Sequence, residues 1–306
     1  MTVPEQLKII QRASGLTQEK LAAKLGVSFV AFNNWITGKA LPRPKALVRI
    51  EALYRLYTGE REVPQKALEG KKALVLAARR RHRSVLREIL SRRDRYDEFM
   101  LALTYHSNRI EGSSVTERET AAILFESAAL PNRTLVEQLE VRNHQAALEF
   151  LMRNVREGNW PTEDIVLQLH RILMNGIDSV AGTYRRHGVR ILGTTVPTAN
   201  HLSVPRFMQT LVRDLASRPR DIIAHVANVH ARFEQIHPFA DGNGRIGRLI
   251  MHAMLLAENL APAIVRQERR RAYMHSLNIA QTGSDPSLLE DFLCDAVLEG
   301  FDVLNA

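Results

Sequence analysis

The stretch IHPFADGNGRIGR, residues 236–248, carries more chemically informative residues than any other part of the chain. Its glycines, Gly242, Gly244 and Gly247, have the G-x-G-x-x-G spacing of a dinucleotide-binding loop, which requires a β-strand before it and a helix after it. The preceding residues do not predict a strand, because apolar side chains recur at helical spacing from Ile222 to Ile236. The pattern therefore indicates a loop between two helices and argues against a Rossmann-type site.

The residue types in this loop suit phosphate binding and proton transfer. A glycine-rich loop lets backbone N–H groups approach an anion, and the helix that follows favours negative charge at its start. Arg245 and Arg248 can add bidentate contacts to phosphate oxygens. Asp241 can hold a hard divalent cation that bridges phosphates, and His237 has the near-neutral pKa of a general base. The loop therefore predicts a site for phosphoryl or nucleotidyl transfer.

The rest of the chain predicts an all-α protein. Apolar residues recur every three or four positions in most segments, and only VRILGTTV, residues 189–196, has the composition of a short β-hairpin. Hydrophobic residues make up 45% and charged residues 25% of the 306 residues. This balance is that of a globular protein with a sizeable core, which argues against a disordered chain.

Cysteine usage and hydropathy indicate the compartment. Cys294 is the only cysteine, so one chain can form neither a disulfide nor a cysteine-based zinc site. No apolar stretch is long enough to span a membrane, and Glu5 precedes any apolar run at the N-terminus. The sequence therefore predicts a cytoplasmic protein that makes no membrane contact.

The net charge of +9 is distributed unevenly along the chain. Residues 1–100 hold 21 Lys and Arg against 10 Asp and Glu, a net of +11, whereas residues 101–306 hold 21 against 23, a net of −2. This asymmetry favours a nucleic-acid-binding head on a near-neutral body, although a solvated basic face would give the same count. Residues 71–95, with ten Lys and Arg, predict a basic amphipathic connecting helix. The expected division is a head over residues 1–58, a linker over 59–96 and a main domain over 97–302.

The head has the start and stop signals of four short helices, expected over residues 6–13, 18–25, 29–37 and 44–57. Thr17 and Ser28 are N-caps, and Gly26 ends the helix between them. Two helices joined by a tight glycine-containing turn are the sequence form of a helix-turn-helix. The segment GLTQEKLAAKLGVSFVAFNNWITGK, residues 15–39, resembles the Cro/repressor type of this motif.

The resemblance implies that the second helix of the pair lies in the major groove of DNA. It implies phosphate contacts from Gln18 and Ser28 and base contacts from Phe29, Asn33 and Asn34, because asparagine can pair with adenine. The apolar start of this helix, FVA, departs from many relatives. A helical bundle that contacts protein is therefore the alternative that stays open.

The motif HPFADGNGRIGR, residues 237–248, is similar at every defined position to the motif of the Fic family. The stretch GTYR, residues 182–185, and the helix that leads into the motif resemble the same family. The resemblance covers roughly residues 97–302 and implies an all-helical Fic fold that transfers AMP from ATP to a protein hydroxyl. It implies ATP and Mg²⁺ at the site and a protein target, which can be the chain itself; self-association is compatible with the sequence.

The resemblance also implies a role for each position of the motif. His237 would deprotonate a Ser, Thr or Tyr hydroxyl of the target, which then attacks the α-phosphate of ATP. Phe239 would anchor the loop in the core, and Asp241 would hold Mg²⁺. The ATP phosphates would be bound by Gly242, Asn243, Gly244, Arg245 and Arg248. The Doc subfamily, which phosphorylates its target, has lysine where Gly244 stands, so the glycine favours AMP transfer.

Three further segments are interpreted in this light. The hairpin expected over residues 189–196 is similar to the flap of the family, which holds the target segment by strand addition. The flap residues are Ile191, Gly193, Thr194, Thr195 and Val196. Asn278 stands where such sites contact nucleotide. Two interpretations stay open for Arg269, Arg270 and Arg271, contact with the adenine-ribose end of the nucleotide or solvated side chains, and the second is favoured.

Residues 107–112, SNRIEG, are similar to the inhibitory motif of Fic proteins whose inhibitory helix precedes the core in the same chain. Ser107, Glu111 and Gly112 occupy its defined positions. The resemblance implies that Glu111 pairs with Arg248, so that its carboxylate takes the place of the γ-phosphate of ATP. Ser107 would help to fix the helix.

The sequence therefore predicts an autoinhibited protein adenylyltransferase with an N-terminal helix-turn-helix. Two other functions stay open at this point. One is a DNA-binding regulator whose Fic domain mainly senses nucleotide, although the intact His237 favours an enzyme. The other is removal of AMP from a protein, with Glu111 orienting a water.

Overall fold

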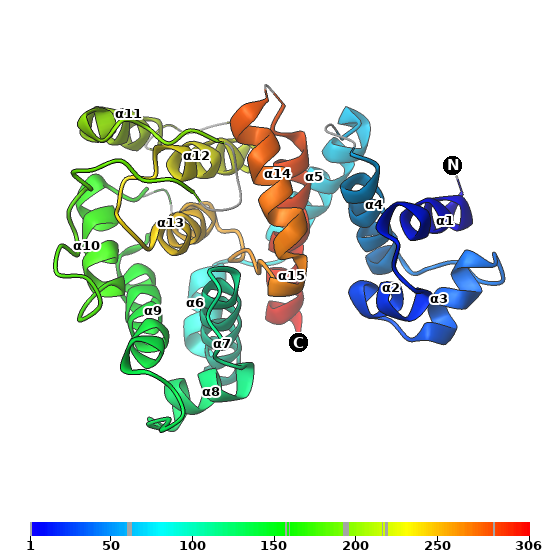
Figure 1. The fold of residues 1–306 in the computed structure, drawn as a ribbon, viewed down its shortest axis with the longest axis horizontal. Coiled ribbons are helices and arrows are strands. Elements are labelled where there is room, and N and C mark those ends of the chain that lie inside the picture. Colours follow the sequence, from blue (N-terminus) through cyan, green and yellow to red (C-terminus); the bar gives the residue numbers. More distant parts are fainter. Residues whose placement is uncertain are drawn as a thin grey trace.

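The computed structural model describes residues 2–59, 63–156, 158, 160–191, 196–215, 217, 220–283 and 285–306. Within these residues the elements are all helices, and a small N-terminal head lies beside a larger body (Figure 1). The predicted all-α fold is confirmed. No helix in the described part of the chain is both long and apolar enough to cross a membrane.

The head is a four-helix bundle. Its helices are α1 (Val3–Ser14), α2 (Gln18–Leu25), α3 (Phe29–Ile36) and α4 (Pro44–Thr58). Their local signals act as expected: the Thr17 hydroxyl accepts a hydrogen bond from the Lys20 N–H at 3.3 Å, and Gly26 takes a left-handed φ of 65°. Leu7, Phe32 and Ile50 are fully buried in a core of the head's own. The expected helix bounds differ from those observed by at most three residues.

The segment after the head forms three helices where one basic helix was expected over residues 71–95. These are α5 (Gln65–Arg79), α6 (Val85–Ser91) and α7 (Arg93–Ile110). The break falls at the run RRRHR, residues 79–83, which offers no apolar side chain for packing. Asn259 stabilises the turn, because its amide donates to the carbonyl of His82 at 2.9 Å and accepts from the N–H of Val85 at 2.7 Å.

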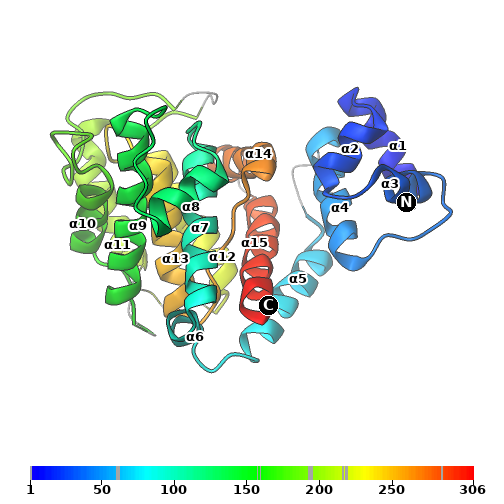
Figure 2. The ribbon, with the colours of Figure 1, turned by 90° about the horizontal axis from the view of Figure 1, so that it is seen from below.

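The body is built around α12 (Ile222–Ile236) and α13 (Asn243–Ala257). All residues of α13 except Gly244 are buried, because α7, α9, α10 and α12 pack around it. Figure 2 shows α7, α9 and α13 side by side, with the head attached through α4 and α5. The remaining elements are α8 (Glu117–Phe125), α9 (Leu135–Asn154), α10 (Glu163–Leu173), α11 (Val204–Leu215), α14 (Arg270–Thr282), α15 (Ser287–Asn305) and two 3₁₀ turns, His201–Ser203 and Gln267–Arg269.

The head is fixed to the body by buried ion pairs. Helix α4 packs against α14, and α5 packs against α15. Asp291 and Asp295 on α15 are buried, and Arg55 of α4 meets Asp291 at 2.8 Å. Lys71 of α5 reaches Asp291 at 2.9 Å and Asp295 at 2.8 Å. Part of the positive excess of the first hundred residues is therefore neutralised inside the molecule.

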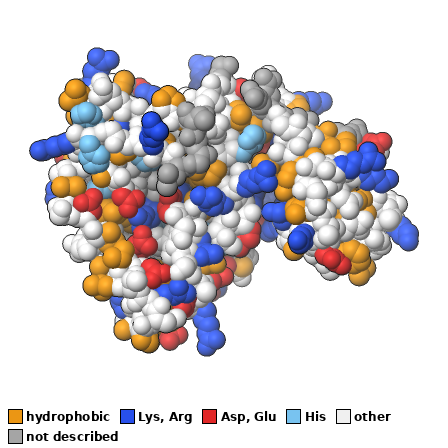
Figure 3. Space-filling model, in the orientation of Figure 1, with side chains coloured by type: hydrophobic (Ala, Val, Ile, Leu, Met, Phe, Trp, Pro, Cys, Tyr) orange, Lys and Arg blue, Asp and Glu red, His pale blue; other side chains and the backbone are white. Residues whose placement is uncertain are grey.

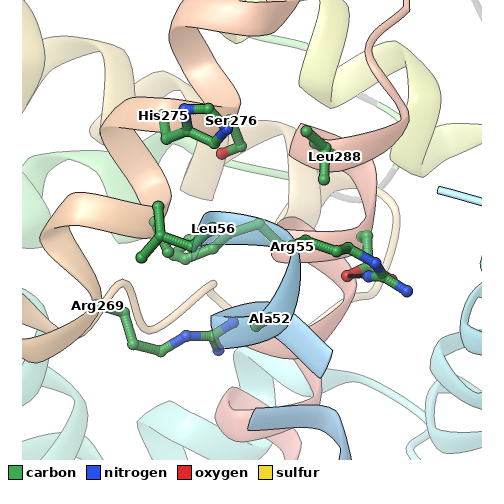
Figure 4. Close-up of a pocket in the computed structure, with 10 residues that line it drawn as sticks. Ala52, Arg55, Leu56, Arg269, His275, Ser276 and Leu288 are labelled. Carbon is green, nitrogen blue, oxygen red and sulfur yellow. Dashed lines mark hydrogen bonds and ion pairs between the residues drawn. The ribbon is translucent and has the colours of Figure 1, made fainter. Parts of the chain in front are cut away.

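A small pocket lies in this contact. Figure 4 shows Ala52 and Leu56 of α4 facing His275 and Ser276 of α14 and Leu288 of α15. Other Lys and Arg side chains stay on the surface of the head and along its contact with the body (Figure 3). These exposed cations are the ones that remain available to a nucleic acid.

The buried pair predicts a stability difference between two substitutions in the head. Arg55→Met leaves Asp291 buried with one partner fewer, and we expect a loss of about 3 kcal/mol in the free energy of unfolding. Lys45→Met is the matched control, because Lys45 pairs with Asp302 at the same distance of 2.8 Å, but both side chains are more than 60% exposed. We expect that control to lose less than about 1 kcal/mol. Urea unfolding measures both, and equal losses would contradict the prediction.

Candidate active site

His237 lies where α12 ends, and its position is set by the backbone. It takes a left-handed conformation, with φ 51° and ψ 61°, which is uncommon for a residue other than glycine. Its Nδ1 lies 3.2 Å from the carbonyl oxygen of Glu234. A carbonyl only accepts, so Nδ1 carries the proton and Nε2 keeps its lone pair. Burial lowers the pKa of His237, which keeps the ring neutral and able to accept a proton.

Buried side chains contact the loop after His237 and fix its conformation. Phe239 is fully buried and stacks on His170 with ring centroids 3.7 Å apart. His170 accepts from the Gly182 N–H at 2.8 Å, so its other nitrogen donates to the Asp241 carbonyl at 3.1 Å. Arg185 donates to the carbonyl of His237 at 2.7 Å. The expected anchoring role of Phe239 is therefore present, and residues 182–185 support the same loop.

The loop leads directly into the N-terminus of α13. Gly242 adopts a left-handed φ of 77°, and Asn243 is the first residue of the helix. The Asn243 side chain faces inward, where it accepts from the N–H of Phe239 and donates to its carbonyl, both at 2.9 Å. Only the backbone of Asn243 is left to meet a ligand. The free N–H groups of this helix start make a ready anion site.

Asp241 fits the position of a magnesium ligand. Its side chain is 70% exposed beside the anion site, and its nearest cation is Arg245 at 3.8 Å. Mg²⁺ in phosphate sites is held by one or two carboxylates together with phosphate oxygens and water. In the described residues no group of three or more His, Cys, Asp or Glu side chains could hold a metal ion. A single carboxylate beside a phosphate site is thus the arrangement that fits this ion.

Arg245 and Arg248 point into different surroundings. Arg245 pairs with Glu140 of α9 at 2.8 Å, and its side chain is only 3% exposed. Arg248 donates from Nε to the Ser107 hydroxyl at 2.9 Å and from a second nitrogen to the Ser107 carbonyl at 3.0 Å. Arg248 is thus the arginine that links α13 to the helix carrying residues 107–112.

Glu111 lies directly on this second arginine. Its Oε1 accepts from Arg248 at 2.6 Å, so the contact expected from the inhibitory motif is present. Burial disfavours the charged form of Arg248. The adjacent Glu111 carboxylate acts in the opposite direction, and the pKa of Arg248 is raised. A Cβ at Gly244 would overlap the Glu111 carboxylate, so glycine is required there for this approach. Gly112 ends the segment with a φ of 104°, a conformation that favours glycine.

Glu111, His237, Gly244 and Arg248 open onto one cleft, whereas Asp241, Gly242, Asn243 and Arg245 are not among its lining residues. Helices α7, α12, α13 and α14 contribute to it, and its lining residues are Ile110, Glu111, Ile191, Glu234, His237, Gly244, Arg248, Arg270, Tyr273, Met274, Leu277, Asn278 and Gln281. Asn278 lies in the wall, as its position in the sequence suggested. Of the expected flap, Ile191 lines the cleft and Val196 is buried, but neither lies in a strand. Gly193, Thr194 and Thr195 lie outside the described residues.

Arg270 and Arg271 are exposed, as expected of solvated side chains, but all three arginines also contact other parts of the chain. Arg270 lines the cleft and donates to the carbonyl of Ile110 at 2.6 Å. Arg269 donates to Asp295 at 3.1 Å, and Arg271 lies over the ring of Tyr57 in the head, 5.3 Å from its centroid. The sequence did not predict these contacts. It also did not predict the contact of Glu140 with Arg245 or that of Glu234 with Gly247, because the partners in each case are distant in the chain.

The DNA-contact candidates lie on α2 and α3 of the head. Ser28 caps α3 by accepting from the Ala31 N–H at 3.2 Å, and Phe29 is 44% exposed. The Asn33 amide donates to Gln18 at 3.3 Å, which joins the two helices of the motif. Asn34 is half-buried. Asn33 is therefore engaged within the motif, whereas the exposed start of α3 is apolar.

Comparison with known proteins agrees with both parts of the chain. Residues 160–255 match the Fic/DOC family, and residues 7–60 match a helix-turn-helix family. The chain therefore contains a Fic domain, with a helix-turn-helix domain in front of it.

Relatives and solved structures extend this result. The chain is 30% identical over 182 residues to the protein adenylyltransferase Fic of Drosophila willistoni, and 31% identical over 183 residues to that of Drosophila erecta. These matches cover 58% of the chain but only 36% and 37% of the relatives. Fic-1 of C. elegans has the same fold, with a TM-score of 0.66, 20% identity and coverage of 98% of this chain and 96% of that one. A Fic family protein from Desulfovibrio desulfuricans has a TM-score of 0.64 at 25% identity, covering 77% and 72%.

Proposed function

We propose that this chain is a protein adenylyltransferase that uses ATP with Mg²⁺ and is inhibited by its own Glu111. The observation that carries the proposal is the cleft, in which a neutral His237 lies beside the N-terminus of α13 and Arg248. Transfer between a phosphate and a hydroxyl requires a base and an anion site in the same cleft. The adenylyltransferases to which the chain is similar support the same reaction.

The reaction joins the target hydroxyl to the α-phosphate of ATP. The hydroxyl oxygen forms a bond to the α-phosphorus, the bond from that phosphorus to the bridging oxygen of the β-phosphate breaks, and pyrophosphate leaves. The hydroxyl proton passes to Nε2 of His237, the nitrogen left unprotonated by the contact with Glu234. Backbone N–H groups at Asn243 and Gly244 hold the phosphates during this step, and the N–H of Gly242, which donates to Asp241 Oδ1 at 2.6 Å in the observed arrangement, joins them when Asp241 turns to Mg²⁺.

Mg²⁺, held through Asp241, neutralises phosphate charge when bound. Arg248 binds the terminal phosphate in this scheme. Arg245 is buried, where its ion pair with Glu140 orients it, and adds positive charge near the N-terminus of α13. Asn278 contacts the nucleoside from the wall formed by α14. The substrate is thus bound by residues of α13 and α14, two helices that pack in the body.

Glu111 blocks this scheme in the observed arrangement. Its carboxylate occupies the face of Arg248 that the terminal phosphate needs, and it covers Gly244 at the anion site. An ATP molecule that cannot reach Arg248 cannot place its α-phosphate against His237. Release of Glu111 is therefore the step that switches the enzyme on.

The reaction type is tested with ATP labelled at two positions. We expect label on the α-phosphate to appear on protein and label on the γ-phosphate to be released as pyrophosphate. The assay uses the Glu111→Gly variant with Mg²⁺ and follows protein-bound label together with intact mass. Transfer of γ-label would mean phosphorylation, and transfer of neither label to the chain or to an added cell extract would contradict the proposal.

The head supports a second activity, DNA binding. Its helix pair has the caps and turn of a helix-turn-helix, and exposed cations surround it. We expect Lys39→Ala, in the exposed loop after α3, to weaken binding to any duplex and to reduce the slope of log affinity against log salt by about 1. Lys66→Ala, which removes an exposed charge from α5, is the matched control and leaves the slope unchanged.

Fluorescence anisotropy with a random-sequence duplex at several salt concentrations measures both variants. Equal slopes for Lys39→Ala, Lys66→Ala and the parent would contradict a DNA-binding role for this face. The apolar start of α3 would then favour a protein partner for the head.

A further inference from the structure

Glu234 is a buried carboxyl group that the reaction described above does not use. It lies on α12 one turn before His237 and lines the same cleft. The residue is only 6% exposed, and its Oε1 has no hydrogen-bond partner among the described residues. A buried polar atom without a partner is costly, so its retention at a ligand cleft calls for a ligand-bound state in which it is satisfied.

The position of Glu234 repeats that of Glu111 one turn further along α13. A Cβ at Gly244 would overlap the Glu111 carboxylate, and a Cβ at Gly247 would overlap Glu234 Oε1. Two carboxyl groups therefore lie against two glycines of one helix face, at i and i+3. Arg248 comes directly after Gly247 in the sequence, and of the two carboxyl groups Glu111 is the one with a hydrogen bond from it. When Glu111 leaves, Glu234 is the carboxyl group that remains beside the vacated face of Arg248.

The groups around Glu234 favour its protonated form. Burial raises the pKa of Glu234 to about 8; Arg248 of α13 acts in the opposite direction, and Glu111 of α7 adds to the rise. Tyr273 of α14 also faces it, and burial raises the pKa of that phenol. On its own helix, burial lowers the pKa values of His230 and His237. Between pH 7 and 9, Glu234 is therefore the group in this cluster that titrates.

We propose that Glu234 is a second ATP-positioning residue, whose carboxylic acid group donates a hydrogen bond to the terminal phosphate that takes the place of Glu111 on Arg248. The inference rests on the proposed function, because it needs ATP in this cleft. A protonated carboxyl is the one form of Glu that can donate to an anion. The phosphate keeps a negative charge where Glu111 was, so the acid form stays favoured with ATP bound. Ionised Glu234 would instead repel the phosphate and compete for Arg248.

The test measures ATP binding without turnover. All variants carry Glu111→Gly and His237→Ala, which open the cleft and remove the base, and ATP with Mg²⁺ is titrated by calorimetry at pH 7. We expect Glu234→Leu, which removes the donor, to raise the Kd roughly ten-fold or more. Glu234→Gln keeps an N–H donor and should stay within about three-fold of the Glu234 parent. Thermal melting of each variant shows whether it is folded.

The pH dependence separates a hydrogen-bond donor from a packing residue. Burial, the main cause of the raised pKa of Glu234, is kept in the Glu234 parent, although the contribution of Glu111 is lost. ATP binds the protonated form, so the Kd of this parent should rise as pH increases from neutral through that raised pKa. Glutamine cannot ionise, so Glu234→Gln should give a flat profile over the same range. An infrared carboxylic-acid band that is present at pH 7 and absent in Glu234→Gln reports the proton directly.

Two failures are distinguishable. If Glu111→Gly does not strengthen ATP binding in the His237→Ala background, the proposed function fails. If ATP binds but Glu234→Leu matches its parent, or the profiles of the parent and Glu234→Gln coincide, the role of Glu234 is overturned and the proposed function stands.

Discussion

Glu111→Gly is expected to raise the rate of self-AMPylation by roughly 10- to 100-fold at neutral pH. The carboxylate accepts from Arg248 at 2.6 Å, and the arginine side chain is 3% exposed while that of Glu111 is 39% exposed, so an ATP phosphate must displace a charge-assisted hydrogen bond to a buried guanidinium. Such bonds contribute about 1.5–3 kcal/mol, which corresponds to roughly that range of rates. Incorporation of α-labelled AMP over time measures the effect.

Two controls separate the causes of inhibition. Glu111→Gln keeps the volume that covers Gly244 but removes the charge, so we expect a rate between those of the parent and Glu111→Gly. Glu117→Gly removes an exposed glutamate from the nearby α8 and should leave the rate unchanged. A Glu111→Gly variant that is no faster than the parent would rule out the inhibitory role, and equal activation by Glu117→Gly would point to general loosening.

His237→Ala, added to Glu111→Gly, is expected to lower the rate by about 10²- to 10⁴-fold, the contribution of a positioned general base. The Kd for ATP should change by less than about three-fold, because the imidazole takes a proton and holds no phosphate. His187→Ala is the matched control, since His187 is exposed and lies outside the cleft. Labelled AMP transfer and calorimetry give the two values separately.

The same histidine predicts the acid limb of the pH profile. Burial lowers the pKa of His237, and a base must be unprotonated, so activity should persist at neutral pH and fall only below the ordinary titration range of imidazole. A midpoint at or above that range would contradict the assignment of His237 as the base. So would a His237→Ala enzyme that keeps the activity of its parent.

Local signals in the sequence predict most of the fold. The helices of the head begin and end near the expected residues because Thr17, Gly26 and Ser28 act on their immediate neighbours. The interruption in residues 71–95 could not be predicted this way. It depends on Asn259, which reaches the turn from the far end of α13 and is distant in sequence.

At the cleft, too, local motifs were predictable and contacts between distant residues were not. The pairing of Glu111 with Arg248 was expected because two family motifs each named one partner, although the residues are 137 positions apart. Glu140 and Glu234 belong to no motif, and no local pattern distinguishes them from surface glutamates. The burial of Glu234 and the contact of Glu140 with Arg245 follow from the packing of α12 and α9 against α13, which only the folded chain reveals.

The contact between head and body has a consequence for evolution and for engineering. Helix α14 lines the cleft with Tyr273 and Asn278 and faces α4 of the head with His275 and Ser276. Arg55 of the head meets an aspartate that is buried in the body. A foreign head joined to this body would therefore have to bring its own cation to that aspartate. Head and body are expected to change together through mutation, not to be exchanged as independent parts.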